Sequence, residues 1–546
     1  MPPQSSIAPH DASAGFPSRR SAVMGLGPMV ATSQPLAAQA GLQTLLAGGN
    51  AVDAAVATAG MLAIVEPTGT GLGGDCFALV YTAATRSLRA LNGSGRAPAA
   101  LDVARLNALG WTAMPQRGAL TVTVPGAVDA WARLVAEHGR MPLAEVLAPA
   151  IATAEKGYPV SELIARAWRA GAPLLALHPA AREHFLPGGD APRAGTRVRQ
   201  LGQARALRQI AEGGAEAFYR GPIADAVVAS VEAAGGCLDH ADLASHASTW
   251  DAPIATRFHG LDVWQCPPNG QGLAALVALA VAHGWDLPAL PWGSGEWMHR
   301  LIEAMRLGFA DAHAWVADPA FAAAPVATLL APAYADARRA LVRSDRAMPA
   351  PASGIPRGSD TVYLAAVDGD GNACSLINSN YMGFGSGIVA GWTGIPLQNR
   401  GAGFTLEAGH PNRLAPGKRP FHTIIPGMAT RTGDGTLFAC FGVMGGHMQP
   451  QGHLQVLAAI RCAAMDPQRA LDAPRFQIVP DGRIALEPWF SDHLRDDLAA
   501  RGHALIPREA TPAMSTFGGG QVIAVSEDGV RIGGSDPRKD GCAVAA

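Results

Sequence analysis

Thr361 stands where the sequence changes character, and its residue type could do chemistry there. The stretch "SGIPRGSDTVYLAAVDGDGN" (353–372) begins with Pro, Gly and Ser, as an exposed linker does, and turns at Thr361 into a strand. If the chain is cut before Thr361, the new α-amine lies beside the threonine hydroxyl. With an ordinary pKa of roughly 7.7–8.0, that amine can act as general base for the hydroxyl, without histidine or metal. The alternative is an ordinary strand-initiating threonine, which the local sequence alone favours.

The elements around Thr361 would have to hold it on a rigid support. Asp370–Gly371 between apolar runs predicts a hairpin that returns the chain to Ser379, close to Thr361. Residues 346–360 are the one linker-like stretch, and they divide a mainly helical part from a strand-rich part. Near the start, "TSQPLAAQAGLQTLLAGGN" predicts a helix with Ser33 as N-cap.

Other motifs favour turns over cofactor sites. "GTGLGG" (69–74) fits a dinucleotide fingerprint, but a helix is expected before it and a strand after it, the reverse of what that site needs. "DGDGNACSLINS" (368–379) lacks the glycine and the glutamate of a calcium loop. The sixteen histidines show no metal-binding spacing. We therefore expect no cofactor and no metal.

Composition limits the partners and the compartment. The chain has 546 residues, 49% hydrophobic and 16% charged, with a net charge of −2, so neither nucleic acid nor an anionic membrane is an expected partner. The seven cysteines are odd in number and include no CxxC, which favours free thiols in a reducing compartment. No apolar run approaches the roughly 20 residues of a membrane span. "SRRSAVMGLGPM" (18–29) is followed by too short an apolar stretch for an export signal, so we expect a cytoplasmic protein.

Nine collinear stretches add a resemblance that covers nearly the whole chain. They are "GPMVATSQPLAAQAG", "GGNAVDAAVA", "VEPTGTGLGGDCFALVY", "TVPGAVDAW", "DTVYLAAVDGDGNACSLINSN", "FGSGIV", "PGKRPFHTIIP", "GVMGGHMQPQG" and "GGSDPR". With them the chain resembles the γ-glutamyltransferase family of N-terminal-nucleophile (Ntn) hydrolases. The resemblance implies an α+β fold, an αββα sandwich of two antiparallel sheets flanked by helices. It also implies self-cleavage between Asp360 and Thr361 into a large subunit, 1–360, and a small subunit, 361–546.

The resemblance assigns catalytic roles to four positions. Thr361 matches the nucleophile of the family, and Ser379 matches a hydroxyl residue that hydrogen-bonds the nucleophile's amine. Gly445 and Gly446 match a glycine pair whose backbone N–H groups form the oxyanion hole, a role for which glycine allows a close approach. Local strand bonding for Ser379 and a plain turn for the glycines are the simpler readings. The family context favours the catalytic ones.

The residues that bind the glutamyl group in the family do not carry over. The arginine that grips the α-carboxylate falls at Ser94, with Arg96 two residues further on, and the aspartate that reads the α-amino group becomes Gly403. Losing that aspartate should remove a charge-assisted contact of roughly 1.5–3 kcal/mol. A glutamine or asparagine of the family becomes Arg400, which adds positive charge.

Three further substrate-binding positions also differ. An asparagine becomes Tyr381, and the first of two serines becomes His422, which leaves Thr423 as the second hydroxyl. This pattern is similar to the amidohydrolase and acylase branch of the family, which includes oxamate amidohydrolase and cephalosporin-acylase-like members. Arg400 could bind a substrate carboxylate bidentately, or form an ordinary surface ion pair.

These observations predict an amidohydrolase or acylase that acts on a small carboxylate-bearing amide such as oxamate. Its partners would be that substrate and the two subunits of one precursor, and further assembly of such pairs stays open. A γ-glutamyl hydrolase or transferase is the first alternative, with Arg96 replacing the missing arginine. A non-enzymatic descendant is the second, although the retained Thr361, Ser379 and glycine pair argue against it.

Overall fold

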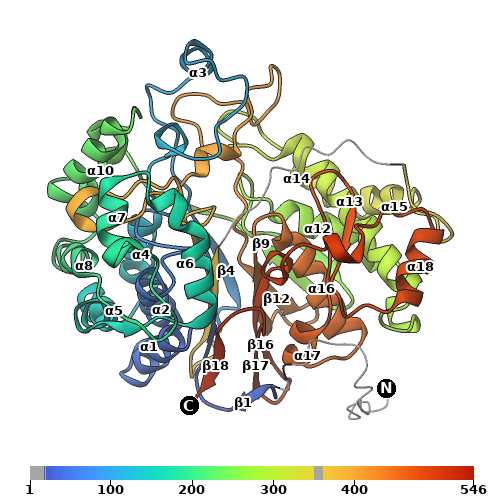
Figure 1. The fold of residues 1–546 in the computed structure, drawn as a ribbon. Coiled ribbons are helices and arrows are strands. Elements are labelled where there is room, and N and C mark those ends of the chain that lie inside the picture. The colour runs from blue at the N-terminus through green and yellow to red at the C-terminus, as the bar shows by residue number, and fades with distance from the viewer. Residues whose placement is uncertain (1–17, 19, 350–360) are drawn as a thin grey trace.

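Two seven-stranded antiparallel sheets form the centre of the molecule (Figure 1). The computed structural model describes residue 18, residues 20–349 and residues 361–546. The first sheet, in spatial order, consists of β1 (Val23–Gly25), β17 (Arg531–Ser535), β16 (Gly519–Val525), β13 (Leu437–Met444), β12 (Gly427–Arg431), β9 (Leu261–Gln265) and β8 (Ile254–Phe258). The second consists of β18 (Cys542–Ala545), β2 (Met29–Thr32), β10 (Val362–Val367), β11 (Ala373–Ser379), β3 (Asp75–Thr82), β4 (Ser87–Gly93) and β7 (Thr249–Asp251).

The two sheets pack face to face through an apolar layer. Phe77, Tyr363 and Ile377 of the second sheet meet Met428 and Cys440 of the first, and all five are buried. Every residue of β10 and β11 is buried, because each strand has the other sheet on one face and helices on the other. The sequence of β10 is therefore continuously apolar, whereas β11 also buries the polar residues Ser375, Asn378 and Ser379.

Helices cover both outer faces and complete an αββα sandwich (Figure 1). On the second sheet lie α1 (Pro35–Leu46), α2 (Ala51–Val65), α4 (Ala127–His138), α5 (Leu143–Lys156), α6 (Glu162–Leu175), α7 (Pro179–Phe185), α8 (Leu201–Gly213) and α10 (Pro222–Ala233). On the first sheet lie α12 (Gly272–His283), α13 (Gly295–Trp315), α15 (Pro332–Arg339), α16 (Met448–Cys462), α17 (Pro467–Asp472) and α18 (Asp492–Ala500).

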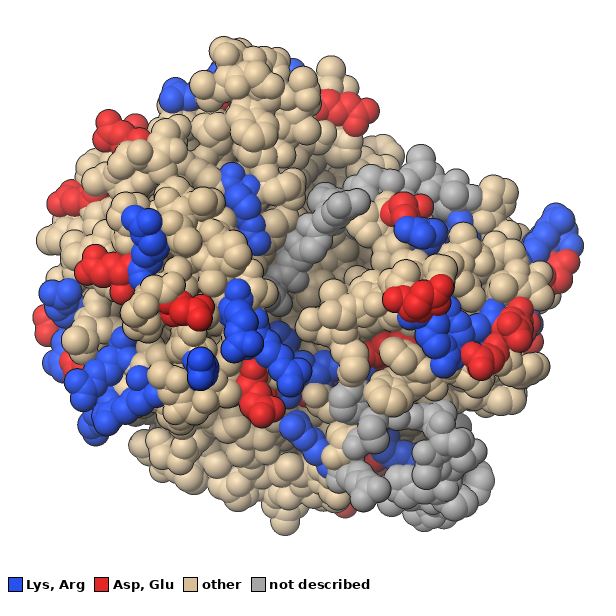
Figure 2. All heavy atoms as spheres, in the orientation of Figure 1, with Lys and Arg blue, Asp and Glu red and all other residues tan. Residues whose placement is uncertain are grey.

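Short elements join these layers. They are α3 (Val103–Ala108), α9 (Glu216–Tyr219), α11 (His240–Ala244), α14 (Val326–Leu329), β5 (Tyr158–Pro159), β6 (Arg197–Val198), β14 (Phe476–Ile478) and β15 (Ile484–Leu486). No helix in the described part of the chain is long and apolar enough to cross a membrane. On the face shown in Figure 2, Lys and Arg are interspersed with Asp and Glu.

Helix α2 supports the strands that carry Thr361. It begins with a capping box, in which Asn50 accepts the backbone N–H of Asp53 and Asp53 accepts that of Asn50. All fifteen of its residues are buried, and its many alanines allow it to lie close against β10 and β11. A fully buried helix without a polar face gives the hairpin a rigid backing.

Most of the local expectations are confirmed. The hairpin turns at 368–372, and "GTGLGG" lies between helix α2 and strand β3 as a turn. The strand after the linker begins at Val362, one residue later than expected. Ser33 as N-cap is wrong: Gln34 holds that position, and the Ser33 hydroxyl donates to Glu66 instead, at 2.6 Å.

The part of the chain before residue 350, expected to be mainly helical, also supplies strands to both sheets. It supplies three strands of the first sheet (β1, β8, β9) and four of the second (β2, β3, β4, β7). The hairpin β10–β11 is inserted between β2 and β3, so segments from both sides of the linker alternate within each sheet.

Candidate active site

The β10–β11 hairpin places Thr361 beside Ser379. Val362 pairs with Asn378, so the next residues outward, Thr361 and Ser379, lie opposite each other. Their hydroxyl oxygens are 3.1 Å apart, and Thr361 is 1% exposed. Ser379 is held in turn, since the backbone N–H of Tyr381 donates to its Oγ at 2.8 Å. The contact of Ser379 with an α-amine stays a prediction, and Asp360 lies outside the described residues.

A turn from the first part of the chain closes on the other side of Thr361. A Cβ built on Gly69 would lie 3.5 Å from the Thr361 nitrogen, and the Gly69 carbonyl accepts the N–H of Asn380 at 3.1 Å. Any side chain at position 69 would therefore pack directly against the backbone nitrogen of Thr361. The local sequence around Gly69 gives no sign of this proximity, because Thr361 lies far away in the chain.

Gly445 and Gly446 form the turn between β13 and the fifteen-residue helix α16. Their φ angles are +118° and +59°, which a residue with a side chain rarely adopts. Among the described residues, no hydrogen-bond acceptor is assigned to either N–H. Free N–H groups just before a helix N-terminus lie in a positive potential, as an oxyanion hole requires.

Arg400 is buried completely, so the interpretation as a surface ion pair is wrong. It lies in the short 3₁₀ helix Arg400–Gly403, where its Nη1 donates to Thr423 Oγ1 at 2.7 Å and its Nε is 3.9 Å from Asp75 Oδ2. The guanidinium lies over the ring of Tyr381, 4.2 Å from the centroid, which is a cation–π contact. Burial lowers the pKa of Arg400 to about 10, so it remains charged at neutral pH.

Two donor groups of Arg400 are unused. Its Nε and Nη2 have no hydrogen-bond partner among the described residues, although both atoms are buried. A buried guanidinium with two free donors is costly unless an acceptor fills the space beside it. A carboxylate has the geometry to do so.

Asp75 and His422 form a buried pair beside Arg400. His422 Nδ1 faces the N–H of Ile424 at 3.3 Å, so Nε2 carries the proton and donates it to Asp75 Oδ2 at 2.9 Å. Burial, together with the charge of Arg400, lowers the pKa of His422 to about 4, and His422 is therefore neutral at pH 7. The negative charge opposite Arg400 comes from Asp75, the first residue of β3.

Comparison with known proteins agrees with this site. The Gamma-glutamyltranspeptidase family profile matches residues 37–546. The chain belongs to the γ-glutamyltranspeptidase family. A glutathione hydrolase-like YwrD proenzyme from Bacillus subtilis is 39% identical and covers 96% of this chain and 99% of its own length. An oxamate amidohydrolase proenzyme from Klebsiella pneumoniae is 34% identical, with 94% and 98% covered.

A solved relative agrees over the whole fold. The crystal structure of cephalosporin acylase from Bacillus halodurans matches with a TM-score of 0.90 and 44% identity, and covers 100% of this chain and 99% of its own. The Ntn-hydrolase sandwich and the amidohydrolase and acylase branch expected from the sequence are thus confirmed. The protein is an enzyme of this family's amide-hydrolase and transpeptidase class.

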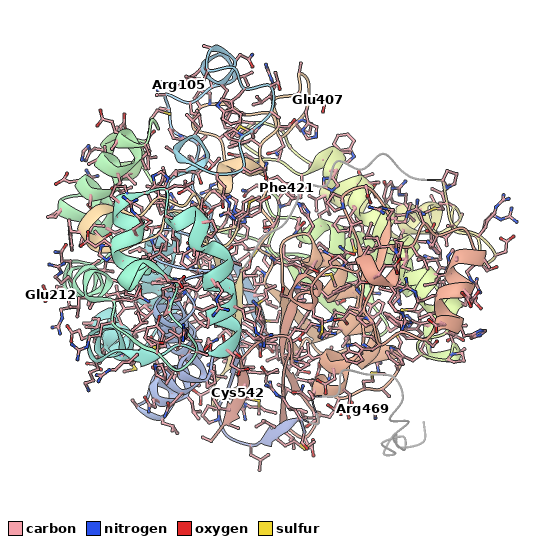
Figure 3. All side chains as sticks on the ribbon, viewed as in Figure 1. Arg105, Glu212, Glu407, Phe421, Arg469 and Cys542 are labelled. Atoms are coloured by element: carbon pink, nitrogen blue, oxygen red, sulfur yellow. The ribbon has the colours of Figure 1, made fainter. Side chains whose placement is uncertain are left out.

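Arg96, a further substrate-binding candidate, forms an ion pair with Asp318. Its Nη1 is 3.2 Å from Asp318 Oδ2 and donates to the Gly417 carbonyl at 3.0 Å. Ser94 is buried, and its Oγ accepts from Asn269 at 3.1 Å. At Gly403 a Cβ would lie 2.9 Å from the carbonyl oxygen of Phe421, which leaves little room for an aspartate. Figure 3 labels Phe421, which precedes the His422–Thr423 segment, near the middle of the molecule.

One buried group in the described structure could offer three metal ligands: His299, Glu303 and His503. Hydrogen bonds already account for its arrangement. His299 Nδ1 faces His503 Nε2 at 2.8 Å, and Glu303 accepts from Arg306 at 2.6 Å. Burial, His299 and nearby arginines lower the pKa of His503 to about 3. The positive charges around the group disfavour a cation there.

Proposed function

We propose that this protein is a self-processing amide hydrolase with Thr361 as its N-terminal nucleophile. Cleavage between Asp360 and Thr361 would give subunits 1–360 and 361–546. The substrate would be a small amide that carries a carboxylate, such as oxamate. The single observation that carries this substrate class is the pair of unused, buried donors on Arg400. The names of the oxamate amidohydrolase and acylase relatives also favour it.

The surroundings of Arg400 favour a substrate anion. Thr423 fixes one nitrogen of the guanidinium, and the ring of Tyr381 fixes its plane. Nε and Nη2 remain in the fork geometry that binds a carboxylate through two hydrogen bonds. Such a contact would hold the substrate by the end opposite to its reacting amide.

Among the described residues, the carboxylate beside Arg400 is that of Asp75, which already has hydrogen-bond partners. Gly403 has no side chain, and Asp75 is already occupied. Asp75 Oδ1 accepts from the N–H of Gly95 at 3.1 Å and from Gln398 at 3.0 Å, and Oδ2 accepts from His422. An α-amino acid would therefore have to bury its ammonium group without a partner, which is unfavourable.

The proposed reaction assigns one task to each of these groups. Thr361 Oγ attacks the amide carbonyl carbon while the α-amine of Thr361 takes the hydroxyl proton. The N–H groups of Gly445 and Gly446 stabilise the oxyanion, and the protonated amine gives its proton to the leaving nitrogen as the C–N bond breaks. Water, activated by the same amine, then attacks the acyl ester, releases the acid and restores the Thr361 hydroxyl.

The test compares kcat/KM of the matured protein for oxamate, another carboxylate amide without an amine, and a γ-glutamyl anilide. We expect the carboxylate amides to be preferred by tenfold or more, about 1.4 kcal/mol in transition-state binding. A tenfold preference for the γ-glutamyl compound would instead support the alternative that the name of the Bacillus subtilis relative suggests. A protein that neither cleaves itself nor turns over any of them would refute the proposal.

We also propose a cytoplasmic location. All seven cysteines are unpaired, and five of them are buried, which suits a reducing compartment. Fractionation of cells that produce the protein, with its own N-terminus intact, would test this.

A further inference from the structure

The side-chain amide of Gln271 joins two segments of the site. Its Nε2 donates to the Thr423 carbonyl at 2.7 Å and to the Gly446 carbonyl at 2.8 Å. Its backbone N–H donates to the His422 carbonyl at 2.8 Å. Gln271 is 0% exposed, so these three bonds are made without competing water.

The two carbonyl groups belong to segments with different tasks. Thr423 carries the hydroxyl that holds Arg400 Nη1. Gly446 carries one of the two N–H groups assigned to the oxyanion, and its carbonyl also accepts the N–H of Gln449 in the first turn of α16. One amide group therefore fixes the distance between the substrate-anion subsite and the oxyanion hole.

Helix capping does not explain this side chain. Gln271 is the N-cap residue of α12, but its side chain makes no capping hydrogen bond, and its Oε1 has no partner among the described residues. Both hydrogens of the amide are directed at the active site instead.

We infer that Gln271 is a positioning residue that couples carboxylate recognition at Arg400 to the oxyanion hole at Gly446. The inference rests on the proposed function. When Arg400 takes a substrate carboxylate, Thr423 and Gln271 hold Gly446 at the separation that this substrate needs. Removing the two N–H donors of the Gln271 side chain should loosen both the Thr423 and the Gly446 segment, because both buried carbonyl groups lose this partner.

Gln271→Met tests this, because it keeps the length of the side chain and removes both donors. Gln265→Met is the matched control: Gln265 is also 0% exposed, it lies six residues earlier, and its Nε2 faces His453 Nδ1 at 3.1 Å. The matured variants are assayed with oxamate and with oxamide, which differ only in the carboxylate.

For Gln271→Met we expect kcat to fall at least tenfold on both substrates, and the preference for oxamate in kcat/KM to fall at least fivefold. The control should stay within twofold of the wild type in both quantities. If kcat or the preference is unchanged in Gln271→Met, or if the control falls equally, the coupling is refuted. A wild-type enzyme without any preference for the carboxylate would instead refute the proposed function.

Gln271→Glu serves if the methionine variant does not mature. It has the same shape, and its carboxyl group can donate to one carbonyl only while it is protonated. Its kcat divided by that of the wild type at the same pH should therefore rise as the pH is lowered. A ratio that does not change with pH would overturn the inference, since a purely structural role of the side chain would not depend on this proton.

Discussion

Replacing Arg400 by methionine should change which amides the enzyme accepts. The substitution keeps the unbranched stem as far as the position of Nε and removes the guanidinium, the only cation in contact with Thr423 and Tyr381 in the described structure. A substrate carboxylate would then be buried without a partner. Breaking a buried ion pair in this way costs about 3–5 kcal/mol, which is a factor of roughly 200 to 5,000 in kcat/KM.

The local structure should tolerate the change. Asp75 keeps its bonds to Gly95, Gln398 and His422 in the variant. Arg400 contributes to lowering the pKa of His422, so its removal should raise that pKa. A protonated His422 would then balance the negative charge of Asp75. The variant should therefore still fold and cleave itself.

The assay is kcat/KM of the matured variant for a carboxylate amide and for its neutral counterpart, for example oxamate and oxamide. The value for the acid should fall by at least a hundredfold, and that for the neutral amide by less than tenfold. Equal losses on both substrates would refute the role of Arg400 in anion recognition. Arg96→Met should change the same ratio less than threefold, because its guanidinium is engaged by Asp318 and Gly417.

Other outcomes follow from the nucleophile and from buried charges. Thr361→Ala should remain a single 56.1-kDa band on a denaturing gel and be inactive, whereas the wild type should give two bands, the smaller beginning at Thr361; any other N-terminus contradicts the cleavage site. Thr361→Ser should keep part of the self-cleavage and part of the amide-hydrolase activity. Ser379→Ala should lower kcat about tenfold with little change in KM, because it loosens the attacking hydroxyl; an unchanged kcat would argue against this role. Burial alone would raise the pKa of Asp536, but Arg475 and Arg538 outweigh it and lower that pKa, so its stabilisation is present above the ordinary range and is lost as the pH falls below about 4. The melting temperature of Asp536→Asn should therefore fall less between pH 6 and pH 3 than that of the wild type, and parallel curves would contradict this.

What could be predicted from the sequence was mostly local. The hairpin that carries Thr361 was readable because an Asp-Gly turn separates two apolar runs. The burial of Arg400 was not, since it depends on Asp75, Tyr381 and Thr423, which come from three separate segments. Asp75 itself was missed, although it lies in a quoted motif, because its partner His422 is 347 residues away in the chain.

The misplaced helix start has a similar cause. A serine two residues before a proline, such as Ser33 before Pro35, is a good N-cap by local rules. At Ser33, however, the hydroxyl donates to the buried carboxylate of Glu66, a charged acceptor. A stronger, charge-assisted bond from another element outweighs the local preference.

The insertion of β10–β11 between β2 and β3 affects how the two pieces of a cleaved chain would dissociate and refold. If the backbone is cut before Thr361, neither piece could leave without breaking hydrogen bonds in the middle of both sheets, so the pair should withstand dilution as one chain does. Refolding after denaturation, however, would become an encounter between two molecules, and its yield should depend on concentration. An uncut precursor can fold as one polypeptide, whereas the two separated pieces of a cut chain could not refold in this way. After cleavage the protein would refold inefficiently once it had unfolded. The interleaved strands would keep it folded by making dissociation of the two pieces slow.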